Sequence, residues 1–342
     1  MKTLMTSAAA LALLAAGPAL AEGELNIYNW GNYTSPEMIE KFEAEYDIKV
    51  TITDYDSNDT ALAKIKAGGH GFDIVVPSGT YVPIFISEGL LMESRPDQME
   101  NFSNVDPTWV DVDFDPGRHY TVPWQWGTVG IAVNTAVYGG DINTTDIFLD
   151  PPEELKGKIN VVPEMMDMMS MAIYSMGGEQ CSTDKDLLRQ VRDKLVAAKE
   201  HWISMDYSTI EKMAAGDLSA TTTWNGAALR TRLKNEDVAF GYPVTGYPVW
   251  MDNAAILADA QNVENAKIFL NFIMEPENAA MLSNFARYAN GISGSEEFME
   301  EVMATAPEVV VPEELKANGV MAKTCPPEAQ KIYTAIWTEL QK

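Results

Sequence analysis

The chain after residue 22 alternates between two kinds of hydrophobic pattern. Short apolar or alternating runs at residues 24–28, 48–54 and 72–76 predict strands. Between them, residues 36–46 and 60–67 repeat apolar positions at helical spacing, which predicts amphipathic helices. A β-α-β-α-β order with short turns is typical of a mainly parallel α/β sheet. We therefore expect a ligand crevice at the carboxyl ends of these strands.

The rest of the chain repeats this α/β character after one long predicted strand. That strand spans residues 121–134, and the Gly- and Pro-rich stretch 241–249 predicts a second connection. We interpret both segments as crossovers between two lobes, which predicts a hinged cleft. The other expected strands span residues 158–162 and 219–224. One further helix is expected to end at residue 176, and the other expected helices span residues 186–198, 208–215, 266–273, 276–285 and 327–341.

The amino-terminal residues have the pattern of a secretory signal. Lys2 precedes the apolar run 8–16, Gly17-Pro18 breaks this run, and Ala19-Leu20-Ala21 supplies a small-x-small cleavage pattern. The run is shorter than the about 20 apolar residues that span a bilayer. We expect residues 1–21 to be a signal peptide and the mature protein to be periplasmic.

The remaining length of about 320 residues is enough for two domains with separate cores. We expect the first α/β lobe to comprise residues 22–130 and about 250–297. The second lobe is expected to comprise about 131–247 and 298–342. This is an α/β architecture of two lobes around a cleft.

The charge of the chain narrows the classes of partner. The sequence has 24 Lys and Arg residues against 50 Asp and Glu, and loss of Lys2 with the signal peptide leaves a formal charge near −27. Such a balance repels nucleic acid and anionic membrane surfaces and steers cations toward the protein. An acid-rich surface that maintains solubility explains the same charge, and both interpretations stay open.

Aromatic side chains stand beside carboxylates near the ends of predicted strands. Trp30 and Tyr33 follow the first strand, Trp224 ends a later one, and Trp250 and Asp252 share one face of an extended segment. A ring face and a carboxylate both attract an organic cation. Each aromatic residue taken alone also fits ordinary core packing. The combined pattern favours capture of a small organic cation.

Two further acids, Glu164 and Asp167, lie three residues apart on one side of a predicted helix start. They either complement the helix dipole or bind a cation, and a glycosidase-like pair is a third interpretation. Ser78 ends a strand but has no GxSxG motif around it. The pattern therefore favours binding over catalysis, with a periplasmic hydrolase as the alternative.

The cysteines and histidines indicate no metal site, and no cofactor is implied. Cys181 and Cys325 are the only cysteines, they form no CxxC motif, and the histidines have no ligand-like spacing to them. In an oxidising compartment the two cysteines either form a disulfide or remain free.

Taken in chain order, several motifs resemble those of the polyamine-binding proteins of bacterial ABC uptake systems, the periplasmic receptors for spermidine and putrescine. The resemblance covers essentially the whole mature chain, and the order and spacing of the motifs are specific. The motifs are Asn29-Trp30-Gly31-Asn32-Tyr33, Asp56-Ser57-Asn58-Asp59, Phe72-Asp73-Ile74-Val75-Val76-Pro77-Ser78, Trp126-Gly127, Val133-Asn134, Trp224-Asn225-Gly226 and Trp250-Met251-Asp252.

The resemblance implies a two-lobed type II periplasmic binding protein and a role for each matching residue. Trp30 and Tyr33 match aromatic residues along the ligand's methylene chain, and Ser78 matches a serine that borders the ligand. Glu164 and Asp167 match acids that bind amino groups from the second lobe. The other matches are Asp252, an acid that binds an amine from the first lobe, and the aromatic walls Trp224, Trp250 and Tyr288.

The chain departs from the family pattern at four positions. Asn32 replaces an acid found in some spermidine receptors, and Thr80 stands where the family has a ring, with Tyr81 adjacent. Ala227 replaces an acid of putrescine-type receptors. Lys323 aligns at or beside a polar ligand-binding position, where its ammonium either repels a polyamine and attracts a carboxylate or points outward into water.

These expectations combine into one functional hypothesis. The protein is expected to capture a polyamine of the spermidine or putrescine class and to deliver it, as a monomer, to an ABC-transporter permease in the inner membrane. A receptor of the same fold for a zwitterionic amine or a quaternary ammonium solute is the nearer alternative.

Overall fold

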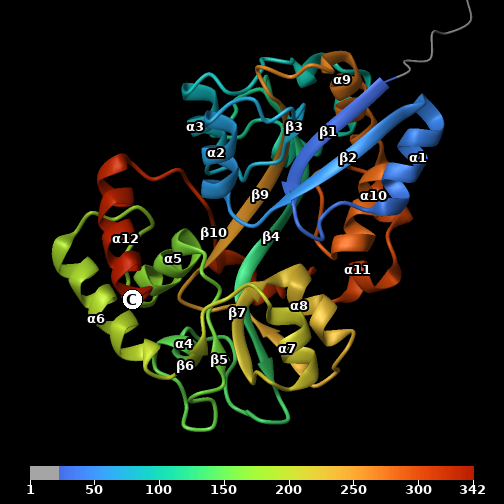
Figure 1. The fold of residues 1–342 in the computed structure, drawn as a ribbon. Coiled ribbons are helices and arrows are strands. Elements are labelled where there is room, and N and C mark those ends of the chain that lie inside the picture. The colour runs from blue at the N-terminus through green and yellow to red at the C-terminus, as the bar shows by residue number, and fades with distance from the viewer. Residues whose placement is uncertain (1–22) are drawn as a thin grey trace, which may run out of the picture.

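Two long strands connect the halves of the molecule in the computed structural model, which describes residues 23–342 (Figure 1). β4 (Thr121–Asn134) and β9 (Tyr247–Ile256) pair antiparallel through the middle of the fold. The prediction for β4 is confirmed at both of its ends. The predicted signal peptide at residues 1–21 lies outside the described residues.

The described chain begins with the predicted β-α-β-α-β order. β1 (Gly23–Trp30) pairs parallel with β2 (Ile48–Tyr55) on one side and β3 (Ile74–Val75) on the other. α1 (Pro36–Tyr46) and α2 (Asn58–Lys66) connect these strands. The parallel pairing brings the carboxyl ends of β1 and β3 to one edge of the sheet, as expected.

Local chemistry explains why α1 begins and ends where the pattern predicts. The Ser35 hydroxyl accepts a hydrogen bond from the Met38 N–H at 3.3 Å, and Pro36 occupies the first turn, where its missing N–H has no cost. Asp47 ends the helix in the left-handed conformation, with φ 55°.

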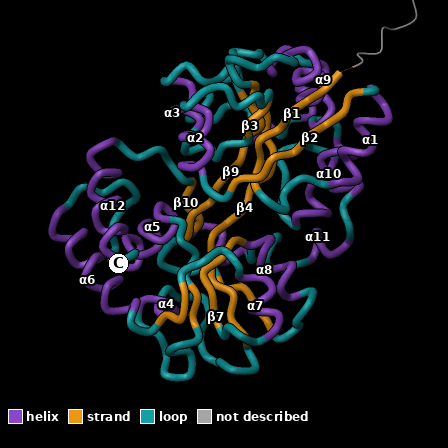
Figure 2. The backbone as a smooth tube through the Cα atoms, viewed as in Figure 1, coloured by secondary structure: helices purple, strands orange, loops and turns teal. Residues whose placement is uncertain are grey.

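One path of strands runs through the whole molecule in the order β2-β1-β3-β9-β4-β7-β5-β6, with β10 beside β9 and β8 beside β4. Figure 2 shows these strands at the centre, with helices around them. The other strands of this sheet are β5 (Ile159–Asn160), β6 (Trp202–Ser204), β7 (Ala220–Trp224), β8 (Val238–Gly241) and β10 (Gly319–Met321).

The remaining helices surround this path and include several short ones. The α-helices are α3 (Val82–Ser87), α4 (Asp146–Leu149), α5 (Met165–Ser175), α6 (Lys185–Lys199), α7 (Thr209–Ala215), α8 (Asn225–Arg232), α9 (Val263–Ile273), α10 (Pro276–Ala286), α11 (Glu301–Thr305) and α12 (Pro327–Leu340). The 3-10 helices are Pro96–Gln98, Glu100–Asn104, Pro107–Trp109, Ser295–Phe298 and Glu313–Asn318.

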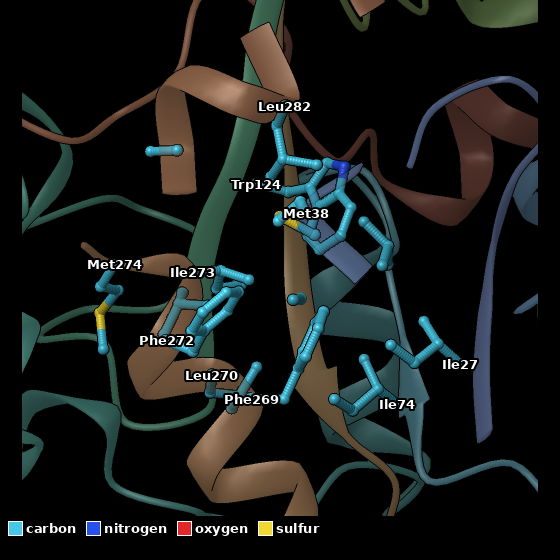
Figure 3. Packing of buried hydrophobic residues seen from close by; sticks show 14 of the residues in the cluster. Ile27, Met38, Ile74, Trp124, Phe269, Leu270, Phe272, Ile273, Met274 and Leu282 are labelled. Carbon is cyan, nitrogen blue, oxygen red and sulfur yellow. The ribbon is translucent and has the colours of Figure 1, made fainter. Parts of the chain in front are cut away.

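β4 contributes to two hydrophobic cores along its length. Near its start, Trp124 is buried against Phe269 and Phe272 of α9 and Phe42 of α1, in the core that Figure 3 shows in part. Further along, its residues 129–133 pack in a second core with α5, α6 and α12. Because two cores share one strand, the strand physically joins the two lobes.

The methionine-rich start of α5 belongs mainly to the second core. Met168, Met169 and Met171 are fully buried there, and Met165 and Met166 pack against it. Flexible thioethers fill irregular apolar space well, and Met166 also lines the cavity described below.

The second crossover starts later in the chain than the sequence pattern predicted. The predicted stretch 241–249 contains a turn before Tyr247, and the strand then continues to Ile256. Gly246, at φ 130°, makes that turn possible because an L side chain rarely adopts this conformation. The exact lobe boundaries stay a prediction.

A disulfide joins the loop after α5 to the segment before α12. Cys181 and Cys325 are bonded, with their Cα atoms 5.1 Å apart and 144 residues between them in sequence. Among residues 23–342, no helix is long and apolar enough to cross a membrane.

Candidate functional site

Side chains from distant parts of the chain line one cavity of about 330 Å³. The loops after β1 and β3, the start of α5, the end of β7 and strand β9 meet there. All nine residues predicted to bind the ligand line this cavity, and so do two further candidates, Asn32 and Thr80. The nine are Trp30, Tyr33, Ser78, Glu164, Asp167, Trp224, Trp250, Asp252 and Tyr288.

Asp252 lies deep in the wall of the cavity, where only 6% of its surface is exposed. The Ser78 hydroxyl donates to Asp252 Oδ1 at 2.7 Å. Asn58 in turn holds Ser78, because its amide donates to Ser78 Oγ and its carbonyl oxygen accepts from the Ser78 N–H, both at 3.1 Å. This chain of hydrogen bonds orients the carboxylate before any ligand arrives.

A buried arginine fixes the strand on both sides of Asp252. Arg118 is fully buried and donates to Asn253 Oδ1 at 2.6 Å, and its guanidinium lies 3.2 Å from Met251 Sδ. It also donates to the Trp109 carbonyl at 2.7 Å. The neighbours of Asp252 are therefore anchored by a residue that does not line the cavity.

Burial raises the pKa of Asp252 from its ordinary value of 3.8 to about 7. The hydroxyls of Ser78 and Tyr33 act in the opposite direction, since they stabilise the charged form, and the charge of Asp167 adds to the rise. A carboxyl group with a raised pKa is one whose charge lacks a compensating cation. A bound ammonium would supply that cation.

Glu164 and Asp167 lie at the start of α5, as predicted, with Glu164 at the N-cap position. Burial raises the pKa of both acids, and the charge of Asp167 raises that of Glu164 further. The Trp224 indole N–H donates to Asp167 Oδ2 at 3.2 Å, and the Tyr207 hydroxyl lies 3.5 Å from Glu164 Oε2. These two acids therefore form a second group of buried carboxyls whose charged form a bound cation would stabilise.

Trp30 forms one aromatic wall of the cavity. Its indole N–H donates to the Val76 carbonyl at 3.0 Å, and its ring lies 4.7 Å from that of Tyr55. Both contacts hold the ring in place, so the face exposed to the cavity is preorganised. Trp30 is partly buried, packs against the core of the first lobe and also lines the cavity, so its role as a ligand wall stays a prediction.

The other walls are built from pairs of rings. Tyr288 makes edge contacts with Tyr33 and Trp250, at centroid distances of 5.7 and 5.1 Å. On the opposite side, Trp224 and Tyr207 are nearly parallel, at 7° and 6.1 Å. Such faces suit a narrow hydrocarbon chain or a cation.

Lys323 is the one candidate that the structure places outside the cavity. It is exposed, whereas the two residues before it, Met321 and Ala322, line the wall. The outward orientation left open by the sequence is therefore the observed one, because the side chain reaches water from the segment after β10. Among the described lining residues, the only cation is Arg230 on α8.

Several cavity residues were missed by the sequence analysis. They are Asp56, Asn58, Tyr81, Phe114, Tyr207 and Arg230. Asp56 and Asn58 lie within a quoted motif, so the sequence contained a usable signal for these two. Arg230 lies outside the quoted motifs, and its place in the cavity depends on how α8 packs. Tyr207 follows β6 in a loop without an apolar pattern, and no sequence signal marks it.

The cavity continues into a second hollow of about 430 Å³. The two share Asp56, Asn58, Tyr81, Glu164, Met166 and Tyr207, and α12 contributes Thr334 and Trp337 to the far side. A ligand longer than the first cavity therefore has room beyond Glu164.

Comparison with known proteins decides the family. Residues 37–310 match the family model described as bacterial extracellular solute-binding protein. The chain belongs to this family. Among its relatives is the putrescine-binding periplasmic protein SpuD of Pseudomonas aeruginosa, which is 26% identical over 99% of this chain and 98% of its own length.

Another relative of this solute-binding protein is the spermidine/putrescine-binding periplasmic protein of Salmonella typhimurium. It is 30% identical over 83% of this chain and 82% of its own length. Among solved structures, a putative spermidine/putrescine ABC transporter protein from Listeria monocytogenes superimposes with a TM-score of 0.86 and 30% identity. That likeness covers 93% of this chain and 98% of the other, and confirms the two-lobed α/β fold.

Proposed function

We propose that this solute-binding protein captures a polyamine of the spermidine or putrescine class in the periplasm and presents it to an ABC-transporter permease. The observation that supports this most is one cavity lined both by aromatic side chains and by carboxyl groups with raised pKa values. The names of the relatives agree with this ligand class.

The geometry suggests how such a ligand is held. Asp252 with Ser78 receives one ammonium group, and Glu164 with Asp167 receives another. Charge-assisted hydrogen bonds of this kind are about twice as strong as neutral ones. Between the acids, the methylene groups lie along the rings of Trp30 and Trp250, which remove apolar surface from water. The second hollow leaves space for the additional aminopropyl group of a triamine.

Binding without chemical conversion is the role that these side chains support. The Ser78 hydroxyl donates to Asp252 and is not paired with a base, and no histidine or cysteine is found among the described residues that line the cavity. We infer that the protein is not an enzyme and that it acts as a monomer. We also infer that its lobes close around the ligand and that the permease recognises the surface of this closed form.

The test is calorimetry with putrescine and spermidine on the parent protein and on Asp252→Asn. We expect the substitution to weaken binding more than tenfold, because a charge-assisted hydrogen bond contributes about 1.5–3 kcal/mol. Asp186→Asn, on an exposed position of α6, is the matched control and should bind like the parent.

Two outcomes would contradict parts of this proposal. Unchanged affinity of Asp252→Asn, with an unfolding temperature close to that of the parent, would remove Asp252 from the site. If no polyamine raised the unfolding temperature or gave a heat of binding with the parent protein, the polyamine assignment itself would be wrong.

A further inference from the structure

Among residues 23–342, Arg230 has no acidic partner and lines a cavity whose other charged lining residues are all acids. It lies in the last turn of α8 and is partly exposed. Within residues 23–342 it forms no salt bridge, whereas every other partly exposed arginine pairs with an acid: Arg95, Arg189, Arg192, Arg232 and Arg287. The side chain therefore retains donor capacity that the protein does not use.

The contacts of Arg230 leave part of its guanidinium unoccupied, although Arg230 also interacts with the Tyr288 hydroxyl and opposes the rise that burial causes in the pKa of Tyr288. Nη1 donates to the Asn32 carbonyl at 3.4 Å, close to the limit for a hydrogen bond, and Nε has no partner. The guanidinium carbon lies 5.9 Å from the centre of the Tyr288 ring. A guanidinium has five N–H donors in a planar fork that matches a carboxylate.

The polar contacts of Arg230 differ from those of the acids that would bind ammonium groups. Asp167 accepts from the Trp224 indole and Asp252 from the Ser78 hydroxyl, whereas Arg230 donates to the Asn32 carbonyl. One turn earlier on the same helix, Ala227 leaves its part of the wall uncharged and small. The cavity thus contains both carboxyl groups and a guanidinium that forms no ion pair with them among residues 23–342.

We propose that Arg230, together with Tyr288, forms a subsite for a carboxylate, so that the cavity accepts linear ω-amino carboxylates. The ammonium end lies at the acids, the methylene chain along the rings, and the carboxylate at the guanidinium fork. This inference rests on the proposed function in one respect, because both proposals place the ligand in the same cavity. It adds a ligand class that a purely acidic site would reject.

A different role for the same residue makes a different prediction. Arg230 reaches from α8 to the loop after β1, so its contact with Asn32 holds these two segments together. If Arg230 only held these two segments together, its replacement would lower the binding affinity of every ligand to the same extent. A carboxylate subsite affects ligands selectively, according to whether they carry an anionic end.

Calorimetry on the full mature chain separates these roles. The ligands are 4-aminobutanoate, 5-aminopentanoate and 6-aminohexanoate, each compared with the diamine of the same carbon number. The variants are Arg230→Gln, Arg230→Lys and, as a matched control, Lys323→Gln, which removes a nearby cation that does not line the cavity. The unfolding temperature without ligand confirms that each variant is folded.

We expect the parent to bind at least one ω-amino carboxylate. Arg230→Gln should weaken that binding about 10- to 100-fold, the loss expected for a charge-assisted hydrogen bond, while diamine binding stays equal or becomes tighter. Arg230→Lys should show a smaller loss, because it keeps the charge without the fork, and Lys323→Gln should match the parent.

Two results would contradict the proposal that Arg230 forms a carboxylate subsite. One is a parent protein that binds none of the three ω-amino carboxylates, and the other is an equal loss of both ligand classes in Arg230→Gln. Because the diamines are measured on the same parent protein, failure of the subsite is distinguished from failure of the polyamine proposal. Binding of amino carboxylates without any diamine binding would support the subsite and contradict the polyamine proposal.

Discussion

At the scale of single residues, Asp252 is a buried carboxyl group held in a fixed position. Ser78 donates to it, Asn58 holds Ser78, and Arg118 donates to the neighbouring residue Asn253. Burial raises the pKa of Asp252 to about 7, so the ligand-free protein carries a proton on this residue in part of the molecules near neutral pH. Affinity for an amine should therefore depend on pH.

The predicted sign follows from comparing the two states of the cavity. As pH rises from 6 to 8, Asp252 loses its proton in the empty protein, and so do Glu164 and Asp167, whose pKa values burial also raises. An aliphatic amine keeps its charge in this range. We expect affinity to increase over this range, and calorimetry near pH 7 in buffers of different ionisation enthalpy should detect proton release. Affinity that stayed flat or fell would refute this.

The same acids make the empty protein less stable as pH rises. A carboxyl group whose pKa is raised on folding binds its proton more tightly in the folded state, so its contribution is present at low pH. For Asp252 this contribution is lost between its unfolded value, about 4, and about 7. Denaturation of the ligand-free protein at pH 5 and pH 8 gives the check, with Asp252→Asn expected to reduce the difference.

At the scale of elements, α5 and α12 show how the second core supports the site. α5 presents Glu164 and Asp167 at its start and buries its methionines below, where Tyr333 and Trp337 of α12 pack in the same core. The disulfide between Cys181 and Cys325 joins the two regions covalently.

Loss of this disulfide should destabilise the protein without abolishing ligand binding. A bond that closes a loop of 144 residues restricts the unfolded chain strongly, and such bonds typically contribute 2–5 kcal/mol. Urea denaturation of the parent with and without reductant, and of a Cys181→Ser, Cys325→Ser double variant, should show this decrease. An equal midpoint in all three samples would show that the bond does not stabilise the fold.

At the scale of the whole molecule, β4 and β9 provide the connection about which the lobes are proposed to move. They pair with each other along the middle of the molecule and extend the sheet on both sides. Thr324 Oγ1 donates to the Thr80 carbonyl at 2.6 Å, and Arg230 approaches Asn32, so contacts also cross the cavity mouth. These few polar contacts are separable without disturbing either core.

Ligand binding should make the molecule more compact. A closed chain of this length is expected to have a radius of gyration of about 20 Å, and an open form should exceed it because the lobes move apart around the two strands. Small-angle X-ray scattering with and without the tightest-binding polyamine provides the measurement. Identical curves at saturating ligand would argue against hinge closure.

Much of the architecture was predictable because it depends on local pattern. The helix Pro36–Tyr46 and the strand Thr121–Asn134 follow from apolar spacing, a Ser cap and flanking turns, all of which are short-range. The aromatic and acidic residues of the site were recognisable because they follow strand ends in motifs that resemble a known family.

What the tertiary structure alone decided concerns relations between residues far apart in sequence. Whether Cys181 meets Cys325, whether Lys323 or Arg230 faces the cavity, and which buried group anchors the neighbours of Asp252 depend on the packing of segments that are distant in sequence. Periodicity reports which face of an element is buried, but not what lies opposite that face. Local pattern marks the acids of the cavity, whereas the position of Arg230, the one cation among the lining residues within 23–342, depends on the packing of the fold.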